Sequence, residues 1–325
     1  MPNPLLEVKG VEMYFTIADS ITRRARRVPA EMLRAVDGVD LEIMPGEALG
    51  LVGESGCGKS TLGRCIVGLH APTAGEIRYA GAALQPKRPR SERRRIQMVF
   101  QDPYSSLNPR MTVRQTLSEL LRVHKMTTRS GVDARCRELL DLVGLPARAL
   151  DSHPRNFSGG QRQRVSIARA LALEPELLVA DEPVSALDVS IRAQVLNLLM
   201  DLQAEFNLAY LFISHDLGVV RHIADEVMVM YLGRTVEHGP KETIFAGPRH
   251  PYTRALLAST PAVDPAHRRL RAAIKGELPS PFDPPPGCAF HRRCPHATPL
   301  CASTVPELRA LADRLVACHH AEAIG

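Results

Sequence analysis

Short apolar runs alternate with segments of helical spacing along this chain, a pattern typical of a mixed α/β protein. Alternating apolar residues from Val39 to Ile43 predict a half-buried strand, and Pro45 with Gly46 predicts the turn that follows it. Continuous apolar runs predict buried strands within 48–52, 177–182 and 209–216. Amphipathic spacing in TLSELLRVHKM and ARCRELLDLVGL predicts helices between residues 101 and 158.

Composition narrows the class of protein. The 325 residues suffice for one large domain or two smaller ones, with 45% hydrophobic and 23% charged residues. Much of the net charge of +6 lies in two basic runs, Arg23–Arg27 and Lys87–Arg95. These are either solvated loops or contacts to anionic lipid headgroups or a membrane-embedded partner. Nucleic acid is disfavoured as a partner, because only 4% of the residues are aromatic.

No targeting or membrane segment is evident. No apolar run reaches the ~18–20 residues that a membrane helix needs, and the start MPNPLLEVKG lacks a secretory apolar region. We therefore expect a cytosolic chain whose seven cysteines are thiols or metal ligands rather than disulfides.

A phosphate-binding loop follows the predicted strand at 48–52. GESGCGKST, residues 53–61, matches G-x-x-x-x-G-K-S between a strand and a helical pattern. Its glycines let the backbone wrap closely around phosphate, Lys59 supplies charge to the β- and γ-phosphates, and the Ser60 hydroxyl suits Mg²⁺. Cys57 is interpreted as a small filler, and Cys65 and Cys136 as core residues.

Two further predicted strands end in groups suited to nucleotide hydrolysis. LLVADE ends in Asp181, expected to hold Mg²⁺ through water, and Glu182, expected to be the general base for the attacking water. His215 ends the strand AYLFISHD, where it could touch the γ-phosphate.

A second phosphate-facing segment has no lysine. NFSGGQRQR, residues 156–164, places a serine and two glycines before a basic helix start, which predicts either an anion site or an ordinary helix cap. One chain thus carries two phosphate-facing loops, of which only one has the usual cation.

In this order, these segments resemble the ATP-binding subunits of ABC transporters, over nearly the whole chain. GESGCGKST resembles the P-loop, FSGGQ the signature motif and LLVADE the acidic strand. The resemblance implies catalytic roles for Glu182 and His215, and Mg²⁺ binding by Ser60, Gln101 and Asp181. It assigns nucleotide binding to Tyr14, Gly53, Ser55, Gly56, Cys57, Gly58, Lys59, Ser60, Thr61 and Gln101.

The same resemblance explains the second loop. In this family two ATP-binding domains pair head to tail, so that the signature loop of one covers the γ-phosphate held by the P-loop of the other. The signature residues here are Ser158, Gly159, Gly160 and Gln161, and those matching the D-loop are Ser185, Ala186, Leu187 and Asp188.

The implied fold is a P-loop NTPase with a RecA-like core, an antiparallel β subdomain, an inserted α-helical subdomain and a small Cys/Pro-rich C-terminal extension. We expect the ATP-binding domain at 1–250, its helical subdomain at about 102–165 and the extension at 251–325. VFQDPYSSLNPR is expected to be the loop that receives a helix of the membrane subunit.

The tail carries four cysteines, Cys288, Cys294, Cys301 and Cys318, without the tight pairs typical of zinc sites. They would suit a [4Fe–4S] cluster about as well as any other metal site, and zinc with nearby histidines or free buried thiols remain alternatives. HPYT and GCAFHRRC resemble the extension of oligopeptide and dipeptide ABC transporter ATPases, in particular the F-type subunits of dipeptide importers. Some of that group bind an iron–sulfur cluster there, so the resemblance favours [4Fe–4S].

The function implied is that of the ATP-hydrolysing motor of a dipeptide or oligopeptide importer, peripheral on the cytoplasmic face of the inner membrane, with ATP and Mg²⁺ as cofactors. The implied partners are two permease subunits, a second paralogous ATP-binding subunit and, indirectly, an extracytoplasmic substrate-binding protein, but no nucleic acid. Alternatives are a soluble ABC ATPase that acts on DNA or ribosomes, a redox-sensing regulator, or import of another cargo such as nickel or heme.

Overall fold

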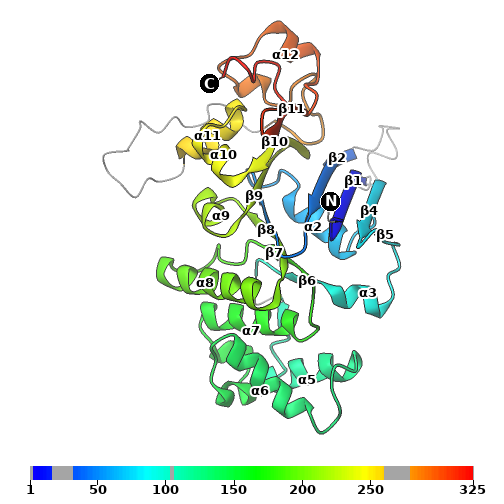
Figure 1. Cartoon of the computed structure of the whole chain (residues 1–325), viewed down its shortest axis with the longest axis vertical. Coiled ribbons are helices and arrows are strands. Elements are labelled where there is room, and N and C mark those ends of the chain that lie inside the picture. The colour runs from blue at the N-terminus through cyan, green and yellow to red at the C-terminus, as the bar shows by residue number, and fades with distance from the viewer. Residues whose placement is uncertain (1–2, 17–31, 103–105, 260–278, 325) are drawn as a thin grey trace, which may run out of the picture. The chain divides into compact units, whose positions relative to one another are not determined.

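The computed structural model describes residues 3–16, 32–102, 106–259 and 279–324 (Figure 1). The chain divides into two compact units. The first unit comprises 1–42, 49–84 and 214–325, and the second comprises 43–48 and 85–213. Within the described ranges, none of the helices combines the length and the apolar character needed to cross a bilayer.

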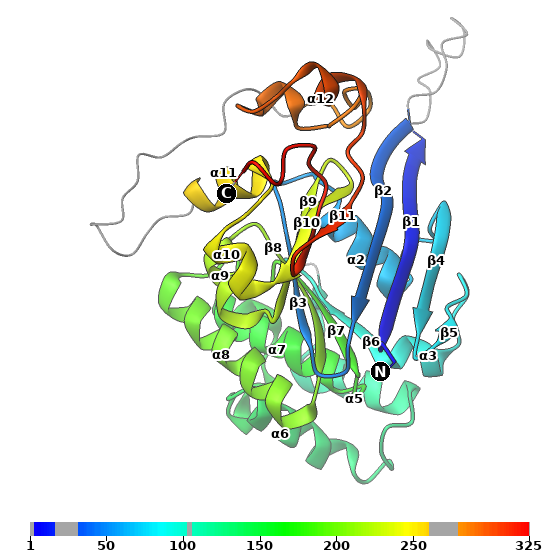
Figure 2. The same ribbon diagram turned by 45° about the horizontal axis from the view of Figure 1, so that its top comes forward.

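The first unit contains an antiparallel sheet in the strand order β2-β1-β4-β5. β4 runs antiparallel to both β1 and β5, and β1, β2 and β4 lie side by side in Figure 2. The strands are β1 (Leu6–Thr16), β2 (Met32–Ile43), β4 (Ala74–Tyr79) and β5 (Ala82–Ala83). β2 contains the predicted alternation, since Val39, Leu41 and Ile43 are buried while Asp40 and Glu42 are exposed.

A second set of strands in this unit follows the order β11-β12-β10-β9-β3. β3 is parallel to β9, and the remaining pairs are antiparallel. These strands are β3 (Ala48–Val52), β9 (Glu226–Tyr231), β10 (Arg234–Pro240), β11 (Arg309–Leu311) and β12 (Arg314–Val316). All five residues of β3 are buried, as predicted for a strand covered on both faces.

Short helices complete the first unit. They are α2 (Lys59–Val67), α9 (Leu217–Ile223), α10 (Lys241–Ala246), α11 (Pro251–Ser259), the 3₁₀ turn η4 (His291–Arg293) and α12 (Pro299–Ser303). The two-stranded ribbon of β11 and β12 joins the chain's last segment to β10 through the pairing of β12 with β10. Residues near the C-terminus therefore belong to the same compact unit as the phosphate loop.

The second unit combines three parallel strands with helices. β7 (Leu177–Asp181) lies between β6 (Ile96–Val99) and β8 (Ala209–Ser214). β7 and β8 are buried along their whole length, as predicted from their apolar runs. The helices are α3 (Arg90–Arg95), α5 (Val113–Val123), α6 (Val132–Leu142), α7 (Gly159–Leu171) and α8 (Val189–Phe206), with 3₁₀ turns η1 (Ala147–Asp151) and η2 (Pro154–Asn156).

Helices α5, α6 and α7 pack on one another (Figure 1). α5 and α6 confirm the amphipathic spacing, because Leu117, Leu121, Leu139 and Leu140 are fully buried. Cys136 on α6 is also fully buried, as is Cys65 on α2, so both are core residues as predicted.

Of the two basic runs, the structure describes only the second. Arg23–Arg27 lies outside the described residues, as do residues 103–105 of the expected docking loop. The second run ends in the short helix α3, which has no buried residue. One of its arginines, Arg95, forms an exposed bidentate ion pair with Glu176 at 2.7 and 2.9 Å.

Candidate functional site: phosphate loop, acidic strand end and signature helix

The phosphate loop occupies residues 53–58 between β3 and α2. Gly58 has φ 104°, and a side chain there would overlap the carbonyl oxygen of Ala35. Only glycine suits such a backbone position. The Lys59 ammonium donates to the carbonyl oxygens of Gly53 at 2.8 Å and Glu54 at 2.9 Å, and the residue is 4% exposed. The lysine is therefore held along the inside of its own loop.

The other predicted loop residues surround this lysine. Ser55 and Gly56 are exposed, and Ser60 and Thr61 lie half buried in the first turn of α2. Cys57 is buried, and burial raises the pKa of its thiol, so it packs as a neutral side chain as expected.

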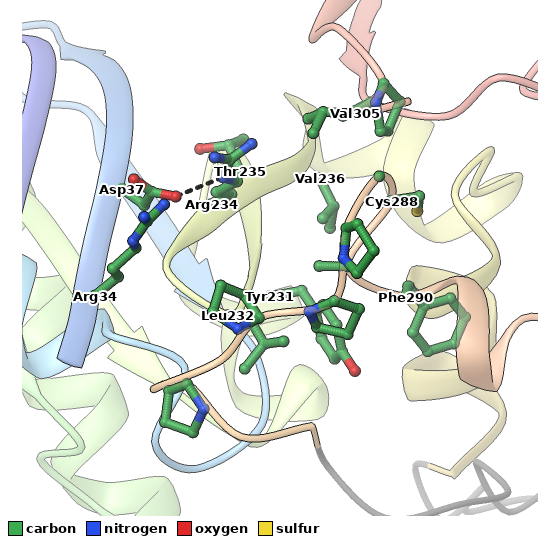
Figure 3. Close-up of a pocket in the computed structure, with 18 of the residues that line it drawn as sticks. Arg34, Asp37, Tyr231, Leu232, Arg234, Thr235, Val236, Cys288, Phe290 and Val305 are labelled. Atoms are coloured by element: carbon green, nitrogen blue, oxygen red, sulfur yellow. Dashed lines mark hydrogen bonds and ion pairs between the residues drawn. The ribbon is translucent and has the colours of Figure 1, made fainter. Parts of the chain in front are cut away.

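Tyr14, which the resemblance assigns to nucleotide binding, is part of a polar cluster. Its hydroxyl donates to Asp37 Oδ1 at 2.5 Å, and the guanidinium of Arg34 lies 5.8 Å from its ring centroid. Arg234 donates through Nε to the other Asp37 oxygen at 2.8 Å (Figure 3). Burial and the bond to Asp37 raise the pKa of Tyr14, which keeps its hydroxyl protonated as a donor.

In the second unit, β7 ends in the predicted carboxylates. Asp181 is the last residue of the strand and is 2% exposed. Glu182 follows with φ 46°, a left-handed backbone conformation that is unusual for a residue with a side chain, and its amide donates to Ile213 O at 2.9 Å. Gln101 donates through Nε2 to Glu182 Oε2 at 2.8 Å. The structure therefore brings together two of the predicted site residues, 81 positions apart in the sequence.

The residues after Glu182 form a tight turn. Ser185 donates from its hydroxyl to Glu182 O at 3.1 Å, and Leu187 N donates to Val184 O at 3.2 Å. Asp188 is the N-cap residue of α8. The predicted segment Ser185, Ala186, Leu187 and Asp188 thus connects the acidic strand end to α8.

Ser158 and Gln161 form a reciprocal capping box at the start of α7. The Ser158 hydroxyl accepts from Gln161 N at 3.3 Å, and the Gln161 side chain accepts from Ser158 N at 3.0 Å. Gly159 and Gly160 lie in the first helical turn, whose amides have no partners within a helix. The sequence SGGQ therefore forms a helix N-terminus with the partial positive charge of its dipole.

His215 follows β8 directly and is exposed. It precedes the capping residue Asp216, which accepts from Gly218 N at 2.9 Å at the start of α9. The capped helix fixes the backbone next to His215.

The expectation of a [4Fe–4S] cluster on Cys288, Cys294, Cys301 and Cys318 is wrong, as is the zinc alternative. Among the residues that the structure describes, no three side chains of the metal-binding types form a group that could hold an ion. Cys318 instead packs with Val316, Ala321 and Ile324, and its sulfur accepts from the His320 amide at 3.4 Å.

Burial raises the pKa of Cys288 to about 11 and also raises the pKa of Cys294 and Cys318, so these three thiols are protonated at neutral pH. The tail cysteines are free thiols that pack within the C-terminal segment.

The C-terminal segment, residues 251–259 and 279–324, contributes residues that the sequence patterns did not predict. Arg293 forms a bidentate ion pair with Glu54 of the phosphate loop at 2.7 and 3.0 Å, and Tyr252 bonds the Glu54 amide at 2.7 Å. Tyr252 and Arg293 lie in the stretches HPYT and FHRRC, whose spacing in the sequence gives no sign of a contact with residue 54. A cavity of about 370 Å³ lies beside this contact, lined by Tyr231, Phe290 and the proline-rich segment 281–287 (Figure 3).

Two protein-family models match parts of this chain. A family model described as "ABC transporter" matches residues 36–185, and one described as "Oligopeptide/dipeptide transporter, C-terminal region" matches 236–301. The di/tripeptide transport ATP-binding protein DppF of Pseudomonas aeruginosa is 53% identical over 89% of this chain and 91% of its own length. The dipeptide transport ATP-binding protein DppF of Escherichia coli is 49% identical over 98% of this chain and 95% of its own.

One further relative and two solved structures are also similar to this chain. The oligopeptide transport ATP-binding protein AppF of Bacillus subtilis is 51% identical over 97% of both chains. The structure of cbiO1 from Clostridium perfringens, part of an ABC transporter complex, has a TM-score of 0.63 and 26% identity, covering 75% of this chain and 91% of its own. The cassette MJ0796, solved as a dimer with ADP and Pi, has a TM-score of 0.63 and 27% identity, covering 73% and 98%.

Proposed function

Because this chain belongs to the family of ATP-binding subunits of peptide ABC transporters, we propose that it is the ATP-hydrolysing motor of an importer of dipeptides or short oligopeptides. The observation that carries the proposal is the carboxylate pair at the end of β7, with Glu182 held by the Gln101 amide at 2.8 Å. A carboxylate in this position activates water for attack on a phosphoryl group.

Each predicted residue has a role in this proposal. Lys59 supplies positive charge to the β- and γ-phosphates, and the amides of Ser55 to Gly58 bind the phosphate oxygens. Tyr14 stacks on adenine. Glu182 accepts the proton of the attacking water, and His215 contacts the γ-phosphate. The signature residues Ser158 to Gln161 cover the γ-phosphate of a neighbouring cassette with the N-terminus of α7.

The residues expected to hold Mg²⁺ fit that ion. The Ser60 hydroxyl, the buried Asp181 carboxylate and the Gln101 amide oxygen belong to the class of hard oxygen ligands that Mg²⁺ prefers. Gln101 donates to Glu182 through its nitrogen, so its oxygen is the atom that a cation would take. The bound ion would neutralise charge on the transferred phosphoryl group.

The proposed assembly places this chain on the cytoplasmic face of the inner membrane, bound to two permease subunits and paired with a second ATP-binding subunit. A substrate-binding protein outside the membrane would deliver the peptide. This assignment is supported by relatives that are named as peptide transport ATP-binding proteins and that match this chain over almost their full length. We propose an ATP-binding domain at 1–250, with a helical subdomain at about 102–165, and an extension at 251–325, supported by the two family matches.

The experiment that tests the proposal compares ATP hydrolysis and ATP binding of the full-length protein with two variants. Glu182→Gln is expected to bind ATP but to lose about two to four orders of magnitude in turnover, the usual contribution of a general base. Lys59→Ala is expected to lose ATP binding itself. Wild-type turnover by Glu182→Gln would remove Glu182 from this role, and unchanged affinity in Lys59→Ala would contradict the phosphate-loop assignment.

The importer assignment has its own test. Affinity purification of the tagged chain from membranes is expected to recover two permease subunits and a second ATP-binding subunit. Recovery of ribosomes or DNA-bound complexes instead would overturn it.

A further inference from the structure

One residue of the phosphate loop, Glu54, is bonded through all three of its polar groups. Its amide donates to the Tyr252 hydroxyl oxygen at 2.7 Å, and its carbonyl accepts from the Lys59 ammonium at 2.9 Å. Its carboxylate accepts two bonds from Arg293, at 2.7 and 3.0 Å. Glu54 therefore connects the phosphate-binding lysine directly to the C-terminal segment of the chain.

The two residues that hold Glu54 are themselves firmly packed. The ring centroid of Tyr252 lies 4.6 Å from that of Tyr231 and 5.4 Å from that of Phe290. Arg293 lies 5.9 Å from the Tyr231 and Phe290 rings, and its side chain is only 6% exposed. Figure 3 shows Tyr231 and Phe290 in this part of the first unit. Because packing holds these side chains in place, a substitution at Arg293 would leave the Glu54 carboxylate without its partner.

The negative charge of Glu54 would weaken phosphate binding if Arg293 did not offset it. A carboxylate in a loop that wraps phosphate repels the ligand unless a cation offsets it. Arg293 supplies that cation in a bidentate geometry that only a guanidinium provides. Removal of one partner from a largely buried pair leaves the other charge uncompensated.

Resting on the proposed function as a nucleotide-binding protein, we propose that Arg293 and Tyr252 are positioning residues of the phosphate loop. Through Glu54 they set the affinity for the phosphate groups of ATP and ADP. The C-terminal segment then acts on the nucleotide site within the same chain, by neutralising Glu54 and by holding the carbonyl that orients Lys59.

The test measures ATP and ADP dissociation constants of the full-length protein by calorimetry, for wild type, Arg293→Gln, Glu54→Gln and the double variant. Arg293→Gln is expected to bind both nucleotides roughly tenfold more weakly, since residues in direct contact couple at this level. The double variant, which restores the local charge balance, is expected to recover most of the affinity. Glu54→Gln alone is expected to bind at least as tightly as wild type.

Ionic strength adds a readout that a purely structural role would not move. The loss in Arg293→Gln is expected to shrink as salt rises, because salt screens the repulsion between Glu54 and phosphate. Arg309→Gln is the matched control, since Arg309 forms a bidentate pair with Glu322 at 2.5 and 2.8 Å in the same segment but has no contact with Glu54 among those described. Its nucleotide affinity is expected to equal that of wild type.

The inference is overturned if Arg293→Gln binds as tightly as wild type, or if the double variant binds as weakly as Arg293→Gln. Thermal unfolding without nucleotide identifies a variant that fails to fold, and Tyr252→Phe then replaces it. That variant lacks the oxygen that accepts the Glu54 amide and is expected to weaken binding; unchanged affinity there would also count against the inference. If wild type itself binds no ATP, the proposed function fails instead.

Discussion

His250 is a buried histidine that stays neutral in the folded protein. It is 1% exposed, its Nδ1 accepts from the Tyr252 amide at 3.1 Å, and its ring centroid lies 5.9 Å from that of Phe290. Burial lowers the pKa of His250 to about 3. In the unfolded chain the same group titrates near ~6.5. Protonation of His250 would therefore disturb its contact with Tyr252, the residue whose hydroxyl accepts from the Glu54 amide.

This shift predicts a pH dependence of stability. Between pH ~6.5 and 3 the unfolded chain binds a proton that the folded protein does not, so the free energy of unfolding falls as the pH falls. The slope from this group is up to about 1.4 kcal/mol per pH unit. His250→Gln, which cannot titrate, is expected to show a flatter decline than wild type in urea unfolding between pH 6 and 4.

If the curve of His250→Gln runs parallel to that of wild type across this pH range, His250 is protonated in the folded state and the assignment fails.

At the scale of elements, the start of α7 combines a helix cap with close packing against α8. Ser158 and Gln161 cap the helix reciprocally. Gly160 faces α8, where an added side chain would overlap Cγ2 of Ile191, whereas a side chain at Gly159 would come no closer than 3.4 Å to Leu187. The two neighbouring glycines therefore differ in their structural role. Gly160 allows α7 to pack closely against α8, whereas packing does not require a glycine at position 159.

This difference predicts that the same substitution costs more stability at Gly160 than at Gly159. Gly160→Ala is expected to lower the free energy of unfolding by about 1–3 kcal/mol, the usual cost of overpacking. Gly159→Ala is expected to stay within about 1 kcal/mol of wild type, because it meets no overlap. Chemical denaturation of both variants checks the pair, and equal losses would show that α8 moves aside for the added methyl group.

At the scale of the whole molecule, the chain carries two elements that are proposed to face phosphate. Lys59 is the first residue of α2, directly after the glycine-rich loop, whereas Ser158 caps α7, which has no lysine in its first turn. In the proposed function the two serve different nucleotides, one in its own chain and one in a neighbouring cassette. The solved cassette MJ0796 is itself a dimer with ADP and Pi.

Such sharing predicts an association that depends on ATP. With hydrolysis blocked by Glu182→Gln, addition of MgATP is expected to convert the purified ATP-binding subunits into stable pairs, either of this chain alone or with its second subunit. Light scattering after size exclusion measures the mass. Lys59→Ala in the same background is expected to abolish pairing, and subunits that remain single with ATP and both partners present would contradict the shared site.

The local elements were determined by the sequence itself. Buried strands, the glycine-rich loop and the capped helix at Ser158 each depend on residues within about ten positions, where side-chain periodicity and backbone φ decide the conformation. The order of these motifs was also enough to identify the family, which the relatives confirm.

Only the tertiary structure decided which distant residues meet. The cluster predicted for the four tail cysteines was wrong, because no three metal-binding side chains in the described part of the chain form a group that could hold an ion, and spacing along the sequence does not reveal this. Conversely, Arg293 and Glu54 are 239 positions apart, and no local pattern links them. Their contact depends on how the C-terminal segment packs against Tyr231 and Tyr252, and that packing is set by the tertiary fold rather than by neighbouring residues.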